Sequence, residues 1–395
     1  MNNLTRRIFL TFVLTGMLIG GGIALTWLLN PYGATRSTFI DPIFRKVKHE
    51  RLVTPYLLRA AEPDTLLIGS SRVLMGMRIE QGYRDGVMNA AIKGATLSQI
   101  SQIVNVALQN PRLKRIVWGV DFFAFGTHWK FEDPNFDARI ADNPTARLED
   151  TLLSLDALGD GFDFYKRSLR GRARLTPTMK ADVPWPMELI CDQYVKDRVD
   201  GLDVGTPVQI AIQMRQIMYL YRRYEFSSAQ RDIFRATVNR IRARNVELLL
   251  FVPPMSEYEL ELIRRSGHWS DLEKFKRAIA AVAPFYDFAA YNGMAPRDEF
   301  YLQVIHFKAA PGHQILRLLL GANGDPCNDD ARIVAASAIR ADAASINDVL
   351  ATEARMRDEA IKRDSRYSRM AAEAVRFPQA EMAAGSSADS GGGDE

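Results

Sequence analysis

The stretch that decides the fold is Thr65-Leu66-Leu67-Ile68-Gly69-Ser70-Ser71-Arg72, a short apolar run that ends in a glycine and two serines. The run predicts a buried strand, and Gly-Ser-Ser predicts a turn directly after it. Further apolar runs predict strands at residues 87–92, 115–123, 246–252 and 285–288. Because helical periodicity fills the segments between them, the sequence favours an α/β domain with a mostly parallel sheet.

The predicted helices alternate with these strands. Helical periodicity is found at residues 99–108, in two parts of 207–243 separated near Ser227-Ser228, at 271–281 and at 312–320. Thr96 and Ser98 precede the first of them, and either can cap it. Residues 130–205 are rich in turn formers and predict an irregular insert or lid.

An apolar segment precedes the α/β domain. Arg6 and Arg7 come before an uncharged run at residues 8–29. The run can span a bilayer, because about 20 residues rising ~1.5 Å each cross the hydrocarbon core. It exceeds a secretory h-region of about 7–15 residues, and no A-x-A cleavage pattern follows it. Trp27 suits the membrane interface and Pro31 ends the helix, so an uncleaved signal anchor is predicted.

The alternative is a twin-arginine export signal, which residues 5–10 (Thr-Arg-Arg-Ile-Phe-Leu) resemble. Either signal delivers the domain to the same side, because the positive-inside bias keeps the arginines in the cytoplasm. We expect a single-pass protein of the inner (cytoplasmic) membrane, with lipid around its N-terminal helix and the bulk of the chain periplasmic or extracellular. Export also permits a disulfide between Cys191 and Cys327.

The composition excludes several classes of protein. The 395 residues carry a formal net charge of only +4, which argues against a general nucleic-acid-binding surface. The two cysteines have no CxxC or Cys/His spacing, so we expect no metal and no other cofactor. The chain is expected to comprise an anchor (1–30), a juxtamembrane segment (31–63), the α/β domain (64–325) and a tail (326–395) that is polar and helical, then disordered.

Chemistry is expected at the carboxyl ends of the strands, where open α/β sheets bind ligands. Ser70 and Ser71 follow the first strand, Gly94 the second and Asp121 the third, while His306 lies in the loop after the fifth. A serine, a histidine and a flexible glycine at neighbouring strand ends can supply a nucleophile, its base and an oxyanion hole.

In order and spacing these segments resemble the SGNH (GDSL-like) hydrolase superfamily, specifically its membrane-anchored, envelope-facing relatives. Residues 66–72 are similar to block I, in which Gly-Asp-Ser carries the nucleophilic serine. The resemblance makes Ser71 the nucleophile and puts Ser70 in the Asp position. Residues 89–94 resemble block II, whose glycine donates a backbone N–H to the oxyanion hole, so Gly94 takes that role.

Two further blocks complete the resemblance. Residues 119–122 look like block III, normally Gly-x-Asn-Asp, and residues 303–306 look like block V, normally Asp-x-x-His, with His306 as the base. The resemblance covers roughly residues 60–320. It implies a three-layer α/β/α, flavodoxin-like domain with a parallel sheet.

The sequence departs from the family at two positions. Asp121 stands where an Asn would donate a hydrogen bond to the oxyanion, and it fits only if it is protonated or turned away. Gln303 stands where an Asp would orient His306; it can accept a hydrogen bond but carries no charge. Asp298 and Glu299 lie nearby in sequence and are alternative acids.

Residues around the nucleophile are expected to bind the substrate. Ser70 and Arg72 flank Ser71, and Arg72 either binds an anionic or sugar substrate or is a salt-bridged turn residue. His128 follows the third strand and is expected at the rim of the site.

The resemblance leaves two functions open. The first is a serine esterase or O-acyltransferase acting on the acyl groups of a cell-envelope polysaccharide, with Gly94, Asp121 and Gln303 completing the machinery of Ser71 and His306. Its partners would be the polysaccharide or an acyl donor, and a membrane-bound O-acyltransferase is a further candidate. The second is a catalytically degenerate module that binds glycan or assembles a polysaccharide-modification complex.

Overall fold

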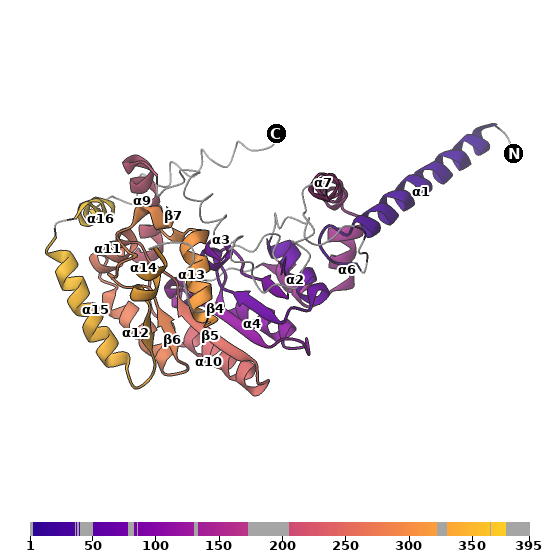
Figure 1. The fold of residues 1–395 in the computed structure, drawn as a ribbon. Helices are drawn as coiled ribbons and strands as arrows, with labels where there is room; N and C mark the ends of the chain where they lie inside the picture. The colour runs from indigo at the N-terminus through magenta and orange to yellow at the C-terminus, as the bar shows by residue number, and fades with distance from the viewer. Residues whose placement is uncertain are drawn as a thin grey trace.

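A central, mostly parallel sheet organises the protein in the computed structural model (Figure 1). The structure describes residues 3–35, 37, 39, 50–77, 83–84, 86–129, 133–172, 205–321, 330–363 and 365–376. In these residues the sheet has seven strands in the order β2-β3-β1-β4-β5-β6-β9. Their bounds are β1 Thr65–Ile68, β2 Tyr83–Arg84, β3 Val87–Asn89, β4 Arg115–Gly119, β5 Glu247–Val252, β6 Phe285–Asp287 and β9 Ile339–Ala341.

The five strands predicted from the sequence are present and form the parallel part of this sheet. Two are shorter than predicted: β3 ends at Asn89, and β4 ends at Gly119, before a 3-10 turn at Phe122–Phe125. β1 pairs with β3 and β4, β4 with β5, and β5 with β6, all in parallel. β2 and β9 lie antiparallel at the two edges. Leu66, Leu67 and Ile68 of β1 are fully buried, as expected of a strand covered on both faces.

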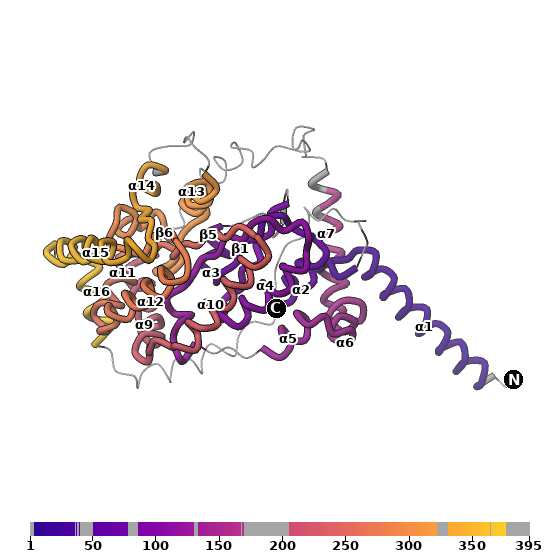
Figure 2. Tube along the Cα trace, turned by 90° about the horizontal axis from the view of Figure 1, so that it is seen from below, coloured from indigo at the N-terminus to yellow at the C-terminus, as the bar shows by residue number. Residues whose placement is uncertain are grey.

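Helices cover both faces of the sheet. Figure 2 shows α13 (Ala309–Leu319) on one side of the strands, and α4 (Leu97–Ala107) and α10 (Ser228–Ala243) on the other. The remaining helices are α2 Glu50–Ala61, α3 Ser71–Gly76, α5 Pro134–Ile140, α6 Pro144–Arg147, α7 Leu155–Arg172, α9 Pro207–Arg222, α11 Glu257–Arg265, α12 Trp269–Ala280, α14 Asp330–Ser337, α15 Ile346–Ile361 and α16 Arg366–Arg376. A separate hairpin pairs β7 (Tyr301–Gln303) with β8 (His306–Phe307).

Local sequence signals set several helix ends where they were predicted. Thr96 caps α4 through a capping box with Gln99. Ser227 caps α10 by accepting from the Gln230 N–H, so the predicted break within 207–243 is confirmed. The segment predicted to be helical from 312 begins earlier, at Ala309.

The expectation of an irregular insert is wrong for its described part. Residues 133–172 form α5, α6, a π-helical turn at Leu148–Leu152 and α7. Asp133 caps α5 and Asn143 caps α6, and a proline follows each cap at the first helical position. These turn formers therefore begin helices. Residues 130–132 and 173–204, which include Cys191, lie outside the described residues, as does Cys327.

The juxtamembrane segment also contains a helix that its weak periodicity does not predict. α2 buries Val53, Tyr56, Leu57 and Leu58 and packs against α4 and α5, so residues 50–61 belong to the folded domain.

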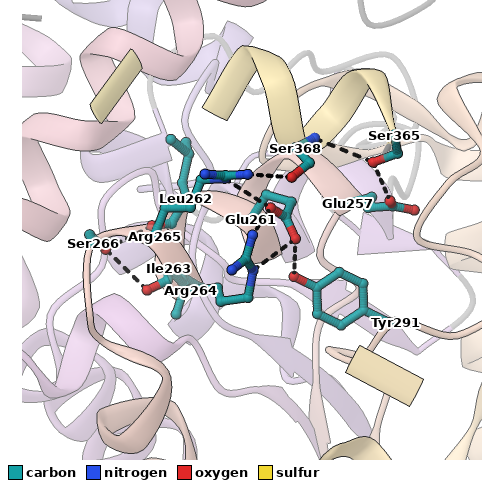
Figure 3. Close-up of polar contacts among 10 residues, drawn as sticks. All are labelled: Glu257, Glu261, Leu262, Ile263, Arg264, Arg265, Ser266, Tyr291, Ser365 and Ser368. Atoms are coloured by element: carbon teal, nitrogen blue, oxygen red, sulfur yellow. Dashed lines mark hydrogen bonds and ion pairs between the residues drawn. The ribbon is translucent and has the colours of Figure 1, made fainter. Parts of the chain in front are cut away.

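The tail is helical as far as residue 376, as predicted, in α14, α15 and α16, but it packs on the α/β domain and adds a strand to the sheet. β9 extends the sheet beyond β6, and α16 packs on α11 and α9. Figure 3 shows the α11–α16 contact, in which Ser365 donates to Glu257 and Arg265 donates to the Ser368 hydroxyl. Polar composition concealed this packing, in which Tyr367, Ala371 and Ala374 of α16 join the hydrophobic core. The residues after 376, predicted to be disordered, lie outside the described residues.

A buried ionic cluster ties α15 to the core. Lys276 of α12 lies 2.9 Å from the carboxylate of Asp287 and 2.6 Å from that of Glu353 on α15, and it donates to the Ala289 carbonyl. All three charged side chains are almost completely buried. The burial raises the pKa of Glu353 to about 8, although Lys276 opposes the shift.

The N-terminal helix α1 (Asn3–Leu29) projects away from this body (Figure 1). Among the described residues it is the one helix long and apolar enough to cross a membrane, with a mean hydropathy of 2.2 over its best window and none of that window buried. Length and composition are therefore consistent with a single-pass anchor.

Candidate functional site

Ser71 lies where the first strand turns into a helix. β1 ends at Ile68, Gly69 and Ser70 make the turn, and Ser71 is the first residue of α3. Gly69 has φ +152°, and a Cβ there would lie 2.5 Å from the Val73 side chain and 2.9 Å from the Gly119 carbonyl oxygen, so only glycine fits. Ser70 caps α3 by accepting a hydrogen bond from the Arg72 N–H at 3.2 Å. This tight turn leaves the Ser71 side chain half-buried at the sheet edge.

His306 is brought to Ser71 by close packing between distant segments. It begins β8, and the ring of the next residue, Phe307, lies directly over the backbone of Gly76 at the end of α3. Gly312 of α13 in turn lies directly against the Gly76 carbonyl. A side chain at either glycine would separate α3 from β8 and α13. These contacts hold the histidine strand against the helix that carries the serine.

The three side chains Ser71, His306 and Gln303 form a hydrogen-bonded chain. His306 Nε2 lies 2.9 Å from Ser71 Oγ, and His306 Nδ1 lies 2.7 Å from Gln303 Oε1. An amide oxygen can only accept, so Nδ1 carries the proton and Nε2 is free to accept from the serine hydroxyl. This is the tautomer that a histidine needs to act as a base toward serine.

The ring of His306 is neutral over a wide pH range. Burial, with a contribution from the positive charge of Arg72, lowers the pKa of His306 to about 4. Neither Asp298 nor Glu299 opposes this shift, because Asp298 bonds Arg366, Tyr258 and Tyr367, and Glu299 pairs with Arg297. In the described part of the chain, then, the Nδ1 partner is an amide and not a carboxylate.

Arg72 lies behind the serine within a buried ionic network. Its side chain is 1% exposed, and it pairs with Asp121 at 3.3 Å and with Glu259 of α11. Tyr221 of α9 donates a hydrogen bond to the same Glu259 oxygen at 2.6 Å. Of the two roles expected for Arg72, the structure shows the salt-bridged turn residue. Ser70 is equally buried, and the contact of either residue with substrate stays a prediction.

Asp121 faces this network. Burial raises its pKa to about 6, against the opposing effects of Arg72 and of a hydrogen bond from Ser70. Of the two arrangements that its position in block III allows, the structure has the carboxylate turned toward Arg72, so its side chain offers no donor to an oxyanion.

Sequence reasoning missed Glu259 and Tyr221. Glu259 lies on the helix that follows β5. At the end of that strand the sequence shows only Pro253-Pro254 and the polar start of a helix. Tyr221 lies in the helical segment predicted at 207–243, where periodicity gives no sign of a polar role; its ring is buried, and its hydroxyl is a polar partner of Glu259. The available signal was an acidic residue on the buried face of a helix next to a strand end.

Gly94 lies in the loop that follows β3, beside the Ser71 turn. The Ile92 N–H bonds the Gly69 carbonyl at 3.2 Å, which joins the two loops. Gly94 itself has φ +60°, a left-handed conformation that favours glycine. α2 supports the turn, because Arg51 donates to the Lys93 carbonyl and Glu50 accepts from the Lys93 N–H. The glycine expected to be flexible therefore lies in a loop that is held by the Gly69 turn on one side and by α2 on the other.

A recess of about 260 Å³ lies beside this loop. Its wall toward the site is formed by Trp129, which donates to the Ala95 carbonyl, and by Phe123, whose ring lies 4.5 Å from that of Trp129 and 5.5 Å from the Arg72 guanidinium. The other lining residues are Gly126, His128, Tyr219, Leu220, Arg223 and Tyr224. His128 therefore lines a hollow next to the site, which agrees with its predicted place at the rim.

The arrangement can perform nucleophilic chemistry at an acyl carbonyl. The site contains a serine hydroxyl, a neutral imidazole that accepts a hydrogen bond from it, and an amide that orients the ring. These are the parts of a catalytic triad in which an uncharged amide takes the place of the acid. In the described part of the chain, no group of three or more His, Cys, Asp or Glu side chains is placed to hold a metal ion. No protein-family model matches the chain, and no curated protein matches it.

Proposed function

We propose that this chain is a membrane-anchored, exported serine esterase or O-acyltransferase related to the SGNH hydrolases, acting on acyl groups of a cell-envelope polysaccharide. One observation carries the proposal: Ser71, His306 and Gln303 form a continuous hydrogen-bonded chain. The Ser71–His306 contact is 2.9 Å and joins residues 235 positions apart in sequence, and the His306–Gln303 contact is 2.7 Å.

The strand order supports the relationship to SGNH hydrolases. The parallel strands run β3-β1-β4-β5-β6, which is the second, first, third, fourth and fifth along the chain. This 2-1-3-4-5 order is that of flavodoxin-like sheets, which bind ligands at the carboxyl ends of the strands near β1 and the third strand. Ser71 follows β1 at that edge.

The geometry supports a two-step acyl transfer. Ser71 Oγ attacks the acyl carbonyl while its proton moves to His306 Nε2, and the backbone N–H groups of Ser71 and Gly94 hold the oxyanion. The imidazolium then gives the proton to the departing sugar oxygen, leaving an acyl-serine. Water or a second sugar hydroxyl, deprotonated by the same nitrogen, takes the acyl group and frees Ser71. The recess beside Trp129 offers space for the sugar that accepts or releases the acyl group.

A second function, a non-catalytic glycan-binding or assembly module, is favoured by the partners of two residues. Gln303 provides no charge to stabilise the imidazolium, and Asp121 provides no donor to the oxyanion because it faces Arg72. Cysteine proteases of the papain type nevertheless work with a neutral Asn behind the histidine, which favours the enzyme.

Labelling by a fluorophosphonate probe tests the enzyme directly. Purified full-length protein in detergent is incubated with the probe, and the modified residue is identified by mass spectrometry. We expect a single adduct on Ser71, none in Ser71→Ala, and a rate about 10²–10⁴-fold lower in His306→Ala, the usual contribution of a general base. Ser98→Ala, which removes an exposed serine of α4, should label like the parent.

Substrate turnover separates the two functions. The enzyme should also release p-nitrophenol from p-nitrophenyl acetate and acetate from acetylated polysaccharide. A protein that is folded, binds glycan equally well as parent and as Ser71→Ala/His306→Ala, and neither labels nor turns over would overturn the enzyme and leave the binding module.

A further inference from the structure

Helix α7 has two separate apolar faces. Ala157, Gly161, Phe164 and Ser168 are buried and recur at spacings of four and three residues, which place them on one side of the helix. Leu155, Phe162 and Leu169 are spaced by seven residues, which places them together on another side. The second set is exposed, by 83%, 40% and 53% respectively. A surface helix of a domain in water normally buries its apolar stripe, and this one buries only one of two.

The buried face packs on the end of the anchor. Phe164 and Leu29 form a small core of their own, with Leu25 packed against it. Gly161 lets the two helices approach closely, because a Cβ there would lie 2.9 Å from the Leu29 side chain. Figures 1 and 2 show α7 crossing the end of α1 and not running alongside it. α7 is therefore fixed at the level where α1 would leave the bilayer.

Exposed apolar side chains concentrate around this point. Besides the three on α7, Leu148 and Leu153 are exposed in the turn before it, and Trp27 is exposed near the end of α1. Phe39, also exposed, stacks on Tyr165 of α7 at 5.7 Å between ring centroids. Elsewhere in the described residues outside α1, the exposed large apolar side chains are Val208, Ile212, Tyr219 and Ile361. A contiguous exposed patch of this kind marks an interaction surface.

The acidic residues of α7 do not interrupt the exposed apolar stripe. Asp156, Asp160 and Asp163 line a recess of about 840 Å³ together with Arg139 and Lys166, and Leu155 and Phe162 of the stripe form part of its lining. Tyr32, which follows α1, donates a hydrogen bond to Asp160 at 3.0 Å. By residue spacing these carboxylates lie between the buried face and the exposed stripe, so they border the stripe on one side and none of them lies within it.

We propose that α7 lies in the membrane interface, with Leu155, Phe162 and Leu169 inserted among the lipids beside α1. The inference rests on the proposed anchorage of α1 and not on catalysis. Burial of large apolar side chains among lipids is favourable, and three of them on one stripe add to the attachment of a helix that is already tethered. Two points of attachment, α1 and α7, would fix the orientation of the domain that carries Ser71 relative to the bilayer.

Photo-crosslinking to lipid tests this placement. The full-length protein is reconstituted in nanodiscs that contain a phospholipid with a diazirine in its acyl chain, irradiated, digested and analysed by mass spectrometry. We expect lipid adducts in α1 and within residues 155–169. Leu155→Ser/Phe162→Ser/Leu169→Ser should reduce the α7 adducts at least tenfold, because it removes the apolar side chains that would be buried among the lipids, without changing probe labelling of Ser71.

Val208→Ser/Ile212→Ser is the matched control, because these α9 side chains are equally exposed but lie away from α1. It should leave the α7 adducts unchanged, and α9 should yield no lipid adduct. Adducts in α1 with none in α7 above the α9 level would overturn the interfacial position. Adducts in neither helix would overturn the anchorage and this inference with it. Ser71 labelling, measured on the same samples, reports separately on the proposed enzyme.

Discussion

Two sets of polar side chains meet at Ser71, and they differ in charge and in exposure. The chain Ser71–His306–Gln303 is uncharged and reaches the surface at Gln303. Behind it, Arg72, Asp121 and Glu259 form a charged network that is almost wholly buried. Both carboxylates near the nucleophile therefore face the cation, and neither faces the histidine.

The difference separates structural from chemical roles. Buried charges are tolerated when they are paired, and removing one partner leaves the others uncompensated. The neutral chain carries no such penalty, so its members can change with little cost to folding. We therefore expect substitutions in the ionic network to affect stability most, and substitutions in the neutral chain to affect the labelling rate of Ser71 most.

The largest expected effect on stability is that of Arg72→Met. It leaves Asp121 and Glu259 buried without their cation, and breaking a buried pair in this way costs about 3–5 kcal/mol. Urea unfolding of the detergent-solubilised protein, followed by circular dichroism, measures the loss. Arg235→Met removes an exposed arginine of α10 and should stay within about 0.5 kcal/mol of the parent. Equal stability of the two variants would contradict a structural role for the network.

Tyr221→Phe should have a smaller effect on the same network. It removes the hydrogen bond to Glu259, and bonds to charged groups contribute about 1.5–3 kcal/mol. Tyr219→Phe, on the same helix but exposed, is the matched control and should be neutral. If Tyr221→Phe lowers probe labelling of Ser71 while stability is unchanged, the network acts on catalysis and the comparison fails.

Gln303→Asp should sharpen the comparison by giving the neutral chain a charge. A carboxylate beside Nδ1 favours the imidazolium and raises the pKa of His306, so we expect at least a tenfold faster labelling of Ser71, about 1.4 kcal/mol of barrier. Stability should change little, because Gln303 is exposed. Asp298→Asn is the control, since Asp298 bonds Arg366, and it should leave the rate unchanged. If Ser71 is labelled more slowly in Gln303→Asp than in the parent, the site requires the amide.

The parallel core was predictable because its signals are local. Apolar runs ended by Gly, Pro or polar turns gave five strands, and Thr96 and Ser227 marked helix starts. A helical tail was predicted, but β9 and the packing of α15 and α16 on the domain were not. Contacts such as those of Glu353 and Tyr367 join residues that are distant in sequence. Periodicity does not reveal a strand of three residues that pairs at the edge of a sheet.

The site was predictable in its residues but not in their partners. The order of strand ends brought Ser71, Gly94, Asp121 and His306 to one edge of the sheet, but the direction of each side chain depends on neighbours distant in sequence. Asp121 faces Arg72, which also pairs with Glu259 of α11, and α11 is placed by packing that no local pattern shows.

The pH dependence of Ser71 labelling tests the central claim, that a neutral, buried His306 oriented by an amide activates the serine. The base must be unprotonated, and burial beside Arg72 lowers its pKa to about 4. The rate constant for fluorophosphonate labelling should therefore stay level as the pH falls from neutral, and decline only with an inflection near pH 4, while circular dichroism shows the protein still folded. An inflection near pH 6.5, the ordinary pKa of histidine, would contradict the account if it persists in Asp121→Asn. The variant is needed because Asp121, with a pKa of about 6, would itself give an inflection in that range.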